Sequence, residues 1–185
     1  MNKDFLAFYD KVPKLLKDFV TIQNTTGTAR EAIREIAKTL QDEGNFYYAA
    51  VRIVKGESLV LDSVFGKNEE DVEYVREYGA SALPIDNTNN EYVATVLRGQ
   101  LQIYSGKQES ALSFNSTPFP FLVSWISLPI QNGGKVVCVI ELGSEEFIFP
   151  PRYIYDAKIF SAFKLQLEFL LSKINQIADS KADIN

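Results

Sequence analysis

The stretch SWISLPIQNGGKVVCVIEL, residues 124–142, is the most informative part of this sequence. Its centre, Asn132-Gly133-Gly134, predicts a tight hairpin turn, because asparagine and glycine tolerate the positive φ angles of two-residue turns. The flanking segments 123–130 and 136–142 are rich in residues that favour strands. We expect two faces on this hairpin, one with Trp125, Ser127, Cys138 and Ile140, the other with Ile126, Leu128, Val137 and Val139.

A second hairpin is predicted earlier in the chain. Residues 46–55 and 58–65 show a period of two on either side of Gly56-Glu57. With this turn, Ile53 faces Val60 and Val51 neighbours Asp62 on a mainly apolar face. The opposite, mixed face is expected to carry Tyr48, Arg52, Leu61 and Ser63.

Helices are expected before, between and after the hairpins. Thr28 to Glu31 matches a capping box, and the apolar periodicity that follows ends at Gly44, so a helix is predicted between them. Shorter helices are expected over 68–78 and 91–97, and extended segments over 83–85 and 101–104.

The two terminal segments carry apolar seams with helical spacing. Residues 5–22 and 160–177 both repeat at steps of 3, 4, 3, 4 and 3. Pro13 interrupts the first seam, so that helix is expected to bend or to begin near it. The last helix is predicted to start near Pro150, to end near Asp179 and to be the longest.

The order of these elements resembles the GAF domain family. The resemblance covers about residues 28–171 and rests on Leu83-Pro84-Ile85-Asp86 with the helix and strand that follow, and on Ser127-Leu128-Pro129-Ile130 with its Gly-Gly turn. It implies an α+β, profilin-like fold with a central antiparallel six-stranded sheet, terminal helices on one face, and a roof of loops and a short helix on the other. We divide the chain into an N-terminal dimerisation helix (1–27), a GAF-like domain (28–171) and the end of the C-terminal helix with a tail (172–185).

Composition limits the partners and the chemistry. The chain has 185 residues, which is enough for one core, and its net charge of −5 gives no reason to expect nucleic acid or an anionic membrane as a partner. It has no histidine and one cysteine, so the usual general base, most zinc sites and any intrachain disulfide are missing. We find no signal peptide or membrane span and expect a cytoplasmic location.

Specialised relatives within the family give further expectations. Relatives that carry a bilin need a cysteine in the roof, whereas Cys138 lies in a predicted late strand, so no covalent bilin is expected. Relatives that reduce free methionine sulfoxide use several cysteines, and the Asn-Lys-Phe-Asp-Glu signature of cyclic-nucleotide-binding members does not occur as such. The sequence therefore predicts no catalytic residue, no metal, no cofactor and a non-enzymatic domain.

A small-molecule site is expected where the mixed faces of the two hairpins meet under the roof. Arg52 either holds a carboxylate or phosphate of a ligand or pairs with an acidic residue such as Glu141. Trp125 either stacks on a ligand or belongs to the core, and Asp86 either contacts a polar ligand or forms a turn. The candidate ligand-binding residues are Tyr48, Arg52, Ser63, Asp86, Tyr104, Trp125 and Ser127.

The terminal seams predict a homodimer. Two seams of equal length can lie side by side, and a symmetric dimer would join four such helices into a bundle. The alternative is that both helices only cover their own sheet. The expected interface residues are Phe5, Phe8, Val12, Leu15, Phe19, Ile22, Phe163, Leu167, Leu170, Ile174 and Ile177.

These features suggest a regulatory domain in which a small molecule changes the placement of the terminal helices and so signals to an effector protein in trans. The alternative is a scaffold for dimerisation or docking, with a pocket filled by Trp125, Phe114 and Tyr48. The sequence leaves open the identity of the ligand and of the effector, and whether residues 105–120 form an ordered lid.

Overall fold

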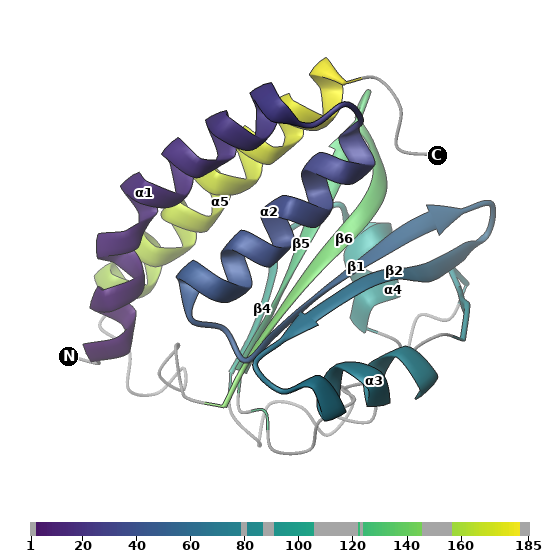
Figure 1. Ribbon diagram of the computed structural model, residues 1–185, viewed down its shortest axis with the longest axis horizontal. Coiled ribbons are helices and arrows are strands. Elements are labelled where there is room, and N and C mark those ends of the chain that lie inside the picture. Colours follow the sequence, from purple (N-terminus) through teal and green to yellow (C-terminus); the bar gives the residue numbers. More distant parts are fainter. Residues whose placement is uncertain are drawn as a thin grey trace.

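The computed structural model in Figure 1 describes residues 3–78, 81–86, 91–105, 122, 124–145 and 157–181. The elements follow the order α1 (Lys3–Thr25), α2 (Ala29–Gly44), β1 (Tyr48–Lys55), β2 (Ser58–Gly66), α3 (Glu69–Tyr78), β3 (Leu83–Pro84), α4 (Glu91–Arg98), β4 (Gln102–Ser105), β5 (Ser124–Asn132), β6 (Lys135–Ser144) and α5 (Ala157–Ser180). The strands form one antiparallel sheet in the order β3-β2-β1-β6-β5-β4. The predicted α+β fold with six antiparallel strands is confirmed.

Helices lie on both faces of this sheet. Figure 1 shows α1, α2 and α5 together on one side, with α1 beside α5, and α3 and α4 on the other side. Apolar side chains of α1, α2 and α5 form one core with Ala49, Val51 and Ile53 of β1. We call this side of the sheet the helix-layer face. The opposite side, which carries Tyr48, Arg52, Trp125 and Glu141, is the α4-side face.

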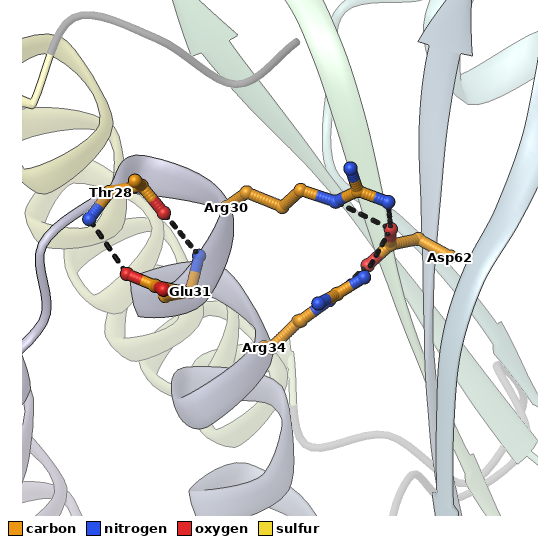
Figure 2. Close-up of polar contacts among 5 residues, drawn as sticks. All are labelled: Thr28, Arg30, Glu31, Arg34 and Asp62. Carbon is orange, nitrogen blue, oxygen red and sulfur yellow. Dashed lines mark hydrogen bonds and ion pairs between the residues drawn. The ribbon is translucent and has the colours of Figure 1, made fainter.

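Local sequence signals account for the ends of α2. The Glu31 backbone N–H donates to Thr28 Oγ1 (3.2 Å), and the Thr28 N–H donates to Glu31 Oε2 (2.9 Å), which completes the predicted capping box (Figure 2). The helix ends at Gly44, and Asn45 follows in the left-handed conformation with φ 61°. Helix α1, by contrast, continues through Pro13.

Both hairpins turn where the sequence predicts, but each contains one β-bulge. Gly133 and Gly134 adopt φ 57° and 78°, as a two-residue turn requires. One register shift lies between Val51 and Arg52 of β1, which leaves Asp62 of β2 as the extra residue, and another lies between residues 130 and 131 of β5. Because side chains alternate along a strand, each one-residue shift reverses the faces beyond it.

Four residues are therefore on another face than predicted. Ser63 pairs with Val51, so it lies on the helix-layer face instead of beside Tyr48. Cys138 and Ile140 pair with Ile130 and Leu128 in the helix-layer core, instead of sharing a face with Trp125. Val139, expected beside Leu128, packs against Tyr92 on the α4-side face.

Candidate functional site

Four candidate ligand-binding residues meet on the α4-side face. They come from two strands that flank β6, and all four are buried: Tyr48, Arg52, Trp125 and Ser127. A fifth candidate, Tyr104 of β4, pairs with Trp125, and their ring centroids are 4.9 Å apart. The Ser127 Oγ makes no hydrogen bond within the described part of the chain. Strand pairing thus assembles a wall of aromatic rings with a few polar groups, which is the usual composition of a small-molecule site.

An ion pair lies at the centre of this wall. Arg52 Nε donates to Glu141 Oε1 at 2.6 Å, and the two residues are only 4% and 1% exposed. Tyr92 of α4 covers the pair, with its ring centroid 5.1 Å from the Arg52 guanidinium carbon. Of the two predicted alternatives for Arg52, the structure shows pairing with Glu141. Burial raises the pKa of Glu141, although the nearby guanidinium opposes this shift.

Tyr48 packs across β6 at a glycine. A Cβ on Gly143 would lie 2.2 Å from Cε1 of Tyr48, so no larger residue fits there unless the ring moves. Burial raises the pKa values of the Tyr48 and Tyr92 hydroxyls, which therefore stay protonated. Tyr92 was not among the candidate residues predicted from the sequence. A hydrogen bond from its hydroxyl lowers the pKa of Glu141 and so partly opposes the effect of burial. The only sequence signal for Tyr92 is its aromatic side chain on a short amphipathic helix.

Two candidates lie away from this wall. Ser63 faces the helix layer because of the β2 bulge. Asp86 is exposed beside an open groove of about 550 Å³ between the β1–β2 turn and β3, at the opposite edge of the sheet from Trp125. Residues 87–90, predicted with Asp86 to form a turn, and residues 106–121, which include most of the possible lid, lie outside the described residues.

The Asp62 bulge is held by two arginines of α2 (Figure 2). Arg34 donates through Nε to Asp62 Oδ2 (2.6 Å) and through a terminal nitrogen to Oδ1 (2.8 Å), and Arg30 Nε donates to Oδ1 (2.8 Å). The Asp62 side chain is buried, whereas both arginine side chains are 38% exposed. Burial alone would raise the pKa of Asp62, but the hydrogen bonds from Arg34 and Arg30 lower it overall.

This ion-pair cluster predicts an acid-sensitive part of the folding stability. Because the folded pKa of Asp62 is lowered, its contribution is present above the pKa of an unfolded aspartate, about 3.9, and is lost as the pH falls through the folded value. We expect Asp62→Asn to lose about 1–2 kcal/mol at pH 7, since water screens the half-exposed arginines. The variant and the wild type should converge only when the pH falls below the folded pKa of Asp62. Urea titrations across this pH range test it, and a constant difference would contradict it.

The predicted dimer-interface residues face inward. Those buried in the helix-layer core are Phe8, Val12, Leu15, Phe19, Leu167, Leu170, Ile174 and Ile177, and Ile22 is half-buried against it. The side chains of Phe5 and Phe163 lie outside those that the structure describes. The α5 seam therefore packs on the sheet and the α1 seam on α2 and α5, and the assignment of the buried residues to a dimer interface is corrected. Among the α5 side chains that the structure describes, from residue 164 on, the large apolar ones that are exposed are Leu165 and Phe169, at 63% and 57%.

The one cysteine has no access to solvent. Cys138 lies in the helix-layer core, and burial raises its pKa, so its thiol is not ionised near neutral pH. Within the described ranges, no cluster of three or more cysteine and acidic residues could hold a metal ion. None of the described helices combines the length and the apolar character that a membrane span requires.

The fold is that of GAF domains. No protein-family model and no curated protein match this sequence. Among solved structures, the chain is similar to the nlh2 GAF domain of A. aeolicus in an inactive state, with a TM-score of 0.67, 16% identity and coverage of 92% of this chain and 96% of that chain. It is also similar to the GAF domain of an Acinetobacter phosphoenolpyruvate-protein phosphotransferase (TM-score 0.62, 12% identity, 90% and 92% covered).

An enzyme shares this fold. The free methionine-R-sulfoxide reductase of Neisseria meningitidis, solved in complex with its substrate, matches with a TM-score of 0.59 and 12% identity over 95% of both chains. This finding overturns the expectation that the domain is not an enzyme. That expectation rested on the missing histidine and the single cysteine, and neither limits what the same fold can catalyse with other groups.

Proposed function

We propose that this chain is a cytoplasmic regulatory domain that binds a small molecule over the α4-side face and forms a homodimer. The carrying observation is the Arg52–Glu141 ion pair, buried among aromatic side chains on the sheet face opposite the helix layer. A buried ion pair is no more stabilising than apolar side chains of the same volume, so stability alone does not account for it. Polar groups placed within an aromatic wall instead support ligand recognition.

The charges of the wall suggest a class of ligand. Arg52 and Glu141 cancel, so this part of the site has no net charge. A ligand with one uncompensated charge would bring that charge into a buried environment at high cost. A zwitterionic or uncharged molecule avoids this cost, and a zwitterion can also match each member of the pair. We therefore propose an electrically neutral ligand.

The helix layer supports the dimer through a different surface from the predicted one. Leu165 and Phe169 are one turn apart on α5 and exposed, and beside them Lys164 and Glu168 form an ion pair within the chain, with 3.7 Å between Nζ and Oε1. In a two-fold dimer this patch meets its own copy, so Lys164 of one copy can face Glu168 of the other. This charge complementarity favours a second copy of the chain as the partner.

Native mass spectrometry tests both the dimer and the bound ligand. Thermal-shift assays with a panel of small metabolites test ligand binding separately. We expect protein purified without denaturation to appear as a dimer with a retained small molecule. Neutral or zwitterionic members of the panel should raise the melting temperature, with about 2.7 kcal/mol of stabilisation at a concentration of 100 Kd. A monomer without adduct and without any thermal shift would contradict the proposal, and release of a chemically altered panel member would identify an enzyme.

A scaffold is the second candidate function. The complete burial of Tyr48 and Trp125 within one chain favours it, because side chains of the protein itself then fill the wall. Phe114, the third residue expected to fill the pocket, lies outside the described residues. A dimer that shows no thermal shift across the whole panel would support this candidate.

A further inference from the structure

The β5–β6 bulge decides which face of β6 carries Glu141. The turn pairs Asn132 with Lys135, and this register continued along the hairpin would place Glu141 opposite Ile126. Ile126 belongs to the helix-layer core, so the carboxylate would then lie among apolar side chains. The bulge shifts the register by one residue, and Glu141 pairs instead with Ser127 on the α4-side face.

The bulge is held from the helix layer. The backbone N–H of Gln131, the residue at the register shift, donates to Asn175 Oδ1 of α5 at 2.9 Å. A bulge leaves backbone groups outside the strand ladder, and a buried N–H without a partner is costly. The extra residue of this bulge is Val137 of β6, since Cys138 pairs with Ile130 and Val136 with Gln131, and the Asn175 side chain supplies an acceptor for the backbone N–H beside it.

The side chain of Gln131 makes a second contact, with the segment that follows α4. Gln131 Nε2 donates to the carbonyl oxygen of Gly99, which follows α4, at 3.2 Å. Helix α4 carries Tyr92 over the Arg52 guanidinium. Gln131 therefore joins α5 to α4, and through α4 to the Arg52–Glu141 pair.

We propose that Asn175 is a positioning residue that holds Gln131 beside the Val137 bulge and thereby fixes the face of β6 on which Glu141 meets Arg52. The β1–β2 hairpin uses the same arrangement, because α2 arginines hold its bulge at Asp62. The effect of Asn175 on ligand binding rests on the proposed function. Its effect on the ion pair does not.

Two measurements without ligand test this role. Asn175→Ala removes the acceptor, and we expect amide exchange at Gln131 to become about tenfold faster. We also expect the Arg52 Nε–H resonance to shift or broaden, because that group donates to Glu141. Asn175→Asp keeps an oxygen acceptor at the same place and should restore both signals. Asn175→Ser keeps a polar side chain that is too short to reach Gln131, so it should show the same two changes as Asn175→Ala. It takes the place of the alanine variant if that variant does not fold.

Asp179→Ala is the matched control. Asp179 lies one turn further along α5 and accepts from the Gly133 N–H at 3.1 Å, at the turn and not at the bulge. This variant should leave the Arg52 resonance unchanged. An equal shift in Asp179→Ala, an unchanged Arg52 resonance in Asn175→Ala or no recovery in Asn175→Asp would each overturn the proposal. If the panel finds no ligand while Asn175→Ala moves the Arg52 resonance, only the proposed function fails.

Discussion

Glu141→Gln is expected to lower the free energy of unfolding by about 3–5 kcal/mol, because it leaves the positive charge of Arg52 buried without its partner. Glutamine has nearly the size of glutamate, so the loss reflects charge rather than packing. Urea denaturation at pH 7 measures it. Glu145→Gln, at an exposed position just after β6, is the matched control and should change the stability by less than about 0.5 kcal/mol.

The double variant Arg52→Met/Glu141→Leu separates stability from function. Both charges are removed together, so most of the stability lost in Glu141→Gln should return. The two charged groups proposed to bind the ligand would nevertheless be missing. A panel member that raises the melting temperature of the wild type should therefore not raise that of the double variant. A change of less than about 1 kcal/mol in Glu141→Gln would mean that Arg52 does not depend on Glu141 in the folded protein.

Local signals were sufficient for the elements and for part of the site. The capping box at Thr28, the glycine turn at Gly133-Gly134 and the two strand periods are properties of neighbouring residues, and the structure has all of them. Pairing of Arg52 with Glu141 was one of two alternatives, since an arginine within a strand needs a partner when it is buried.

The faces of the strands could not be predicted in full, because they depend on the bulges. A bulge adds one residue, and no local pattern marks Asp62 or Val137 as its position. What contacts the bulges comes from far along the chain: two α2 arginines bind Asp62, and Asn175 binds Gln131 beside Val137. Ser63 and Cys138 were therefore assigned to the wrong face, although both hairpins were predicted correctly.

The terminal seams show a similar limit. Spacing of 3 and 4 residues identifies the apolar side of a helix, but it does not say whether the same chain or a second copy covers that side. The structure shows that α5 packs on the sheet and that α1 packs on α2 and α5, so both seams are covered within one chain and a dimer needs the exposed side chains outside them.

Leu170 and Phe169 are adjacent on α5, but their variants are expected to change different properties. Leu170→Ala should lower the stability of the fold, whereas Phe169→Lys should change only the subunit number. Leu170 is 1% exposed, so its truncation should lower the free energy of unfolding by about 2–5 kcal/mol and leave the subunit number unchanged wherever the chain is folded. Phe169 is largely exposed, and lysine there should change the stability of the monomer by less than about 0.5 kcal/mol. Urea denaturation at low protein concentration measures both.

The subunit number then distinguishes the two surfaces of α5. In the proposed dimer, lysine at position 169 places two like charges near the two-fold axis, so Phe169→Lys should convert the dimer to monomer in sedimentation experiments. Loss of the dimer in folded Leu170→Ala, with Phe169→Lys still dimeric, would return the interface to the buried seam and would require α5 to leave the sheet. Because Leu170 packs in the same core as the strands, such a helix could not separate without unfolding much of the domain.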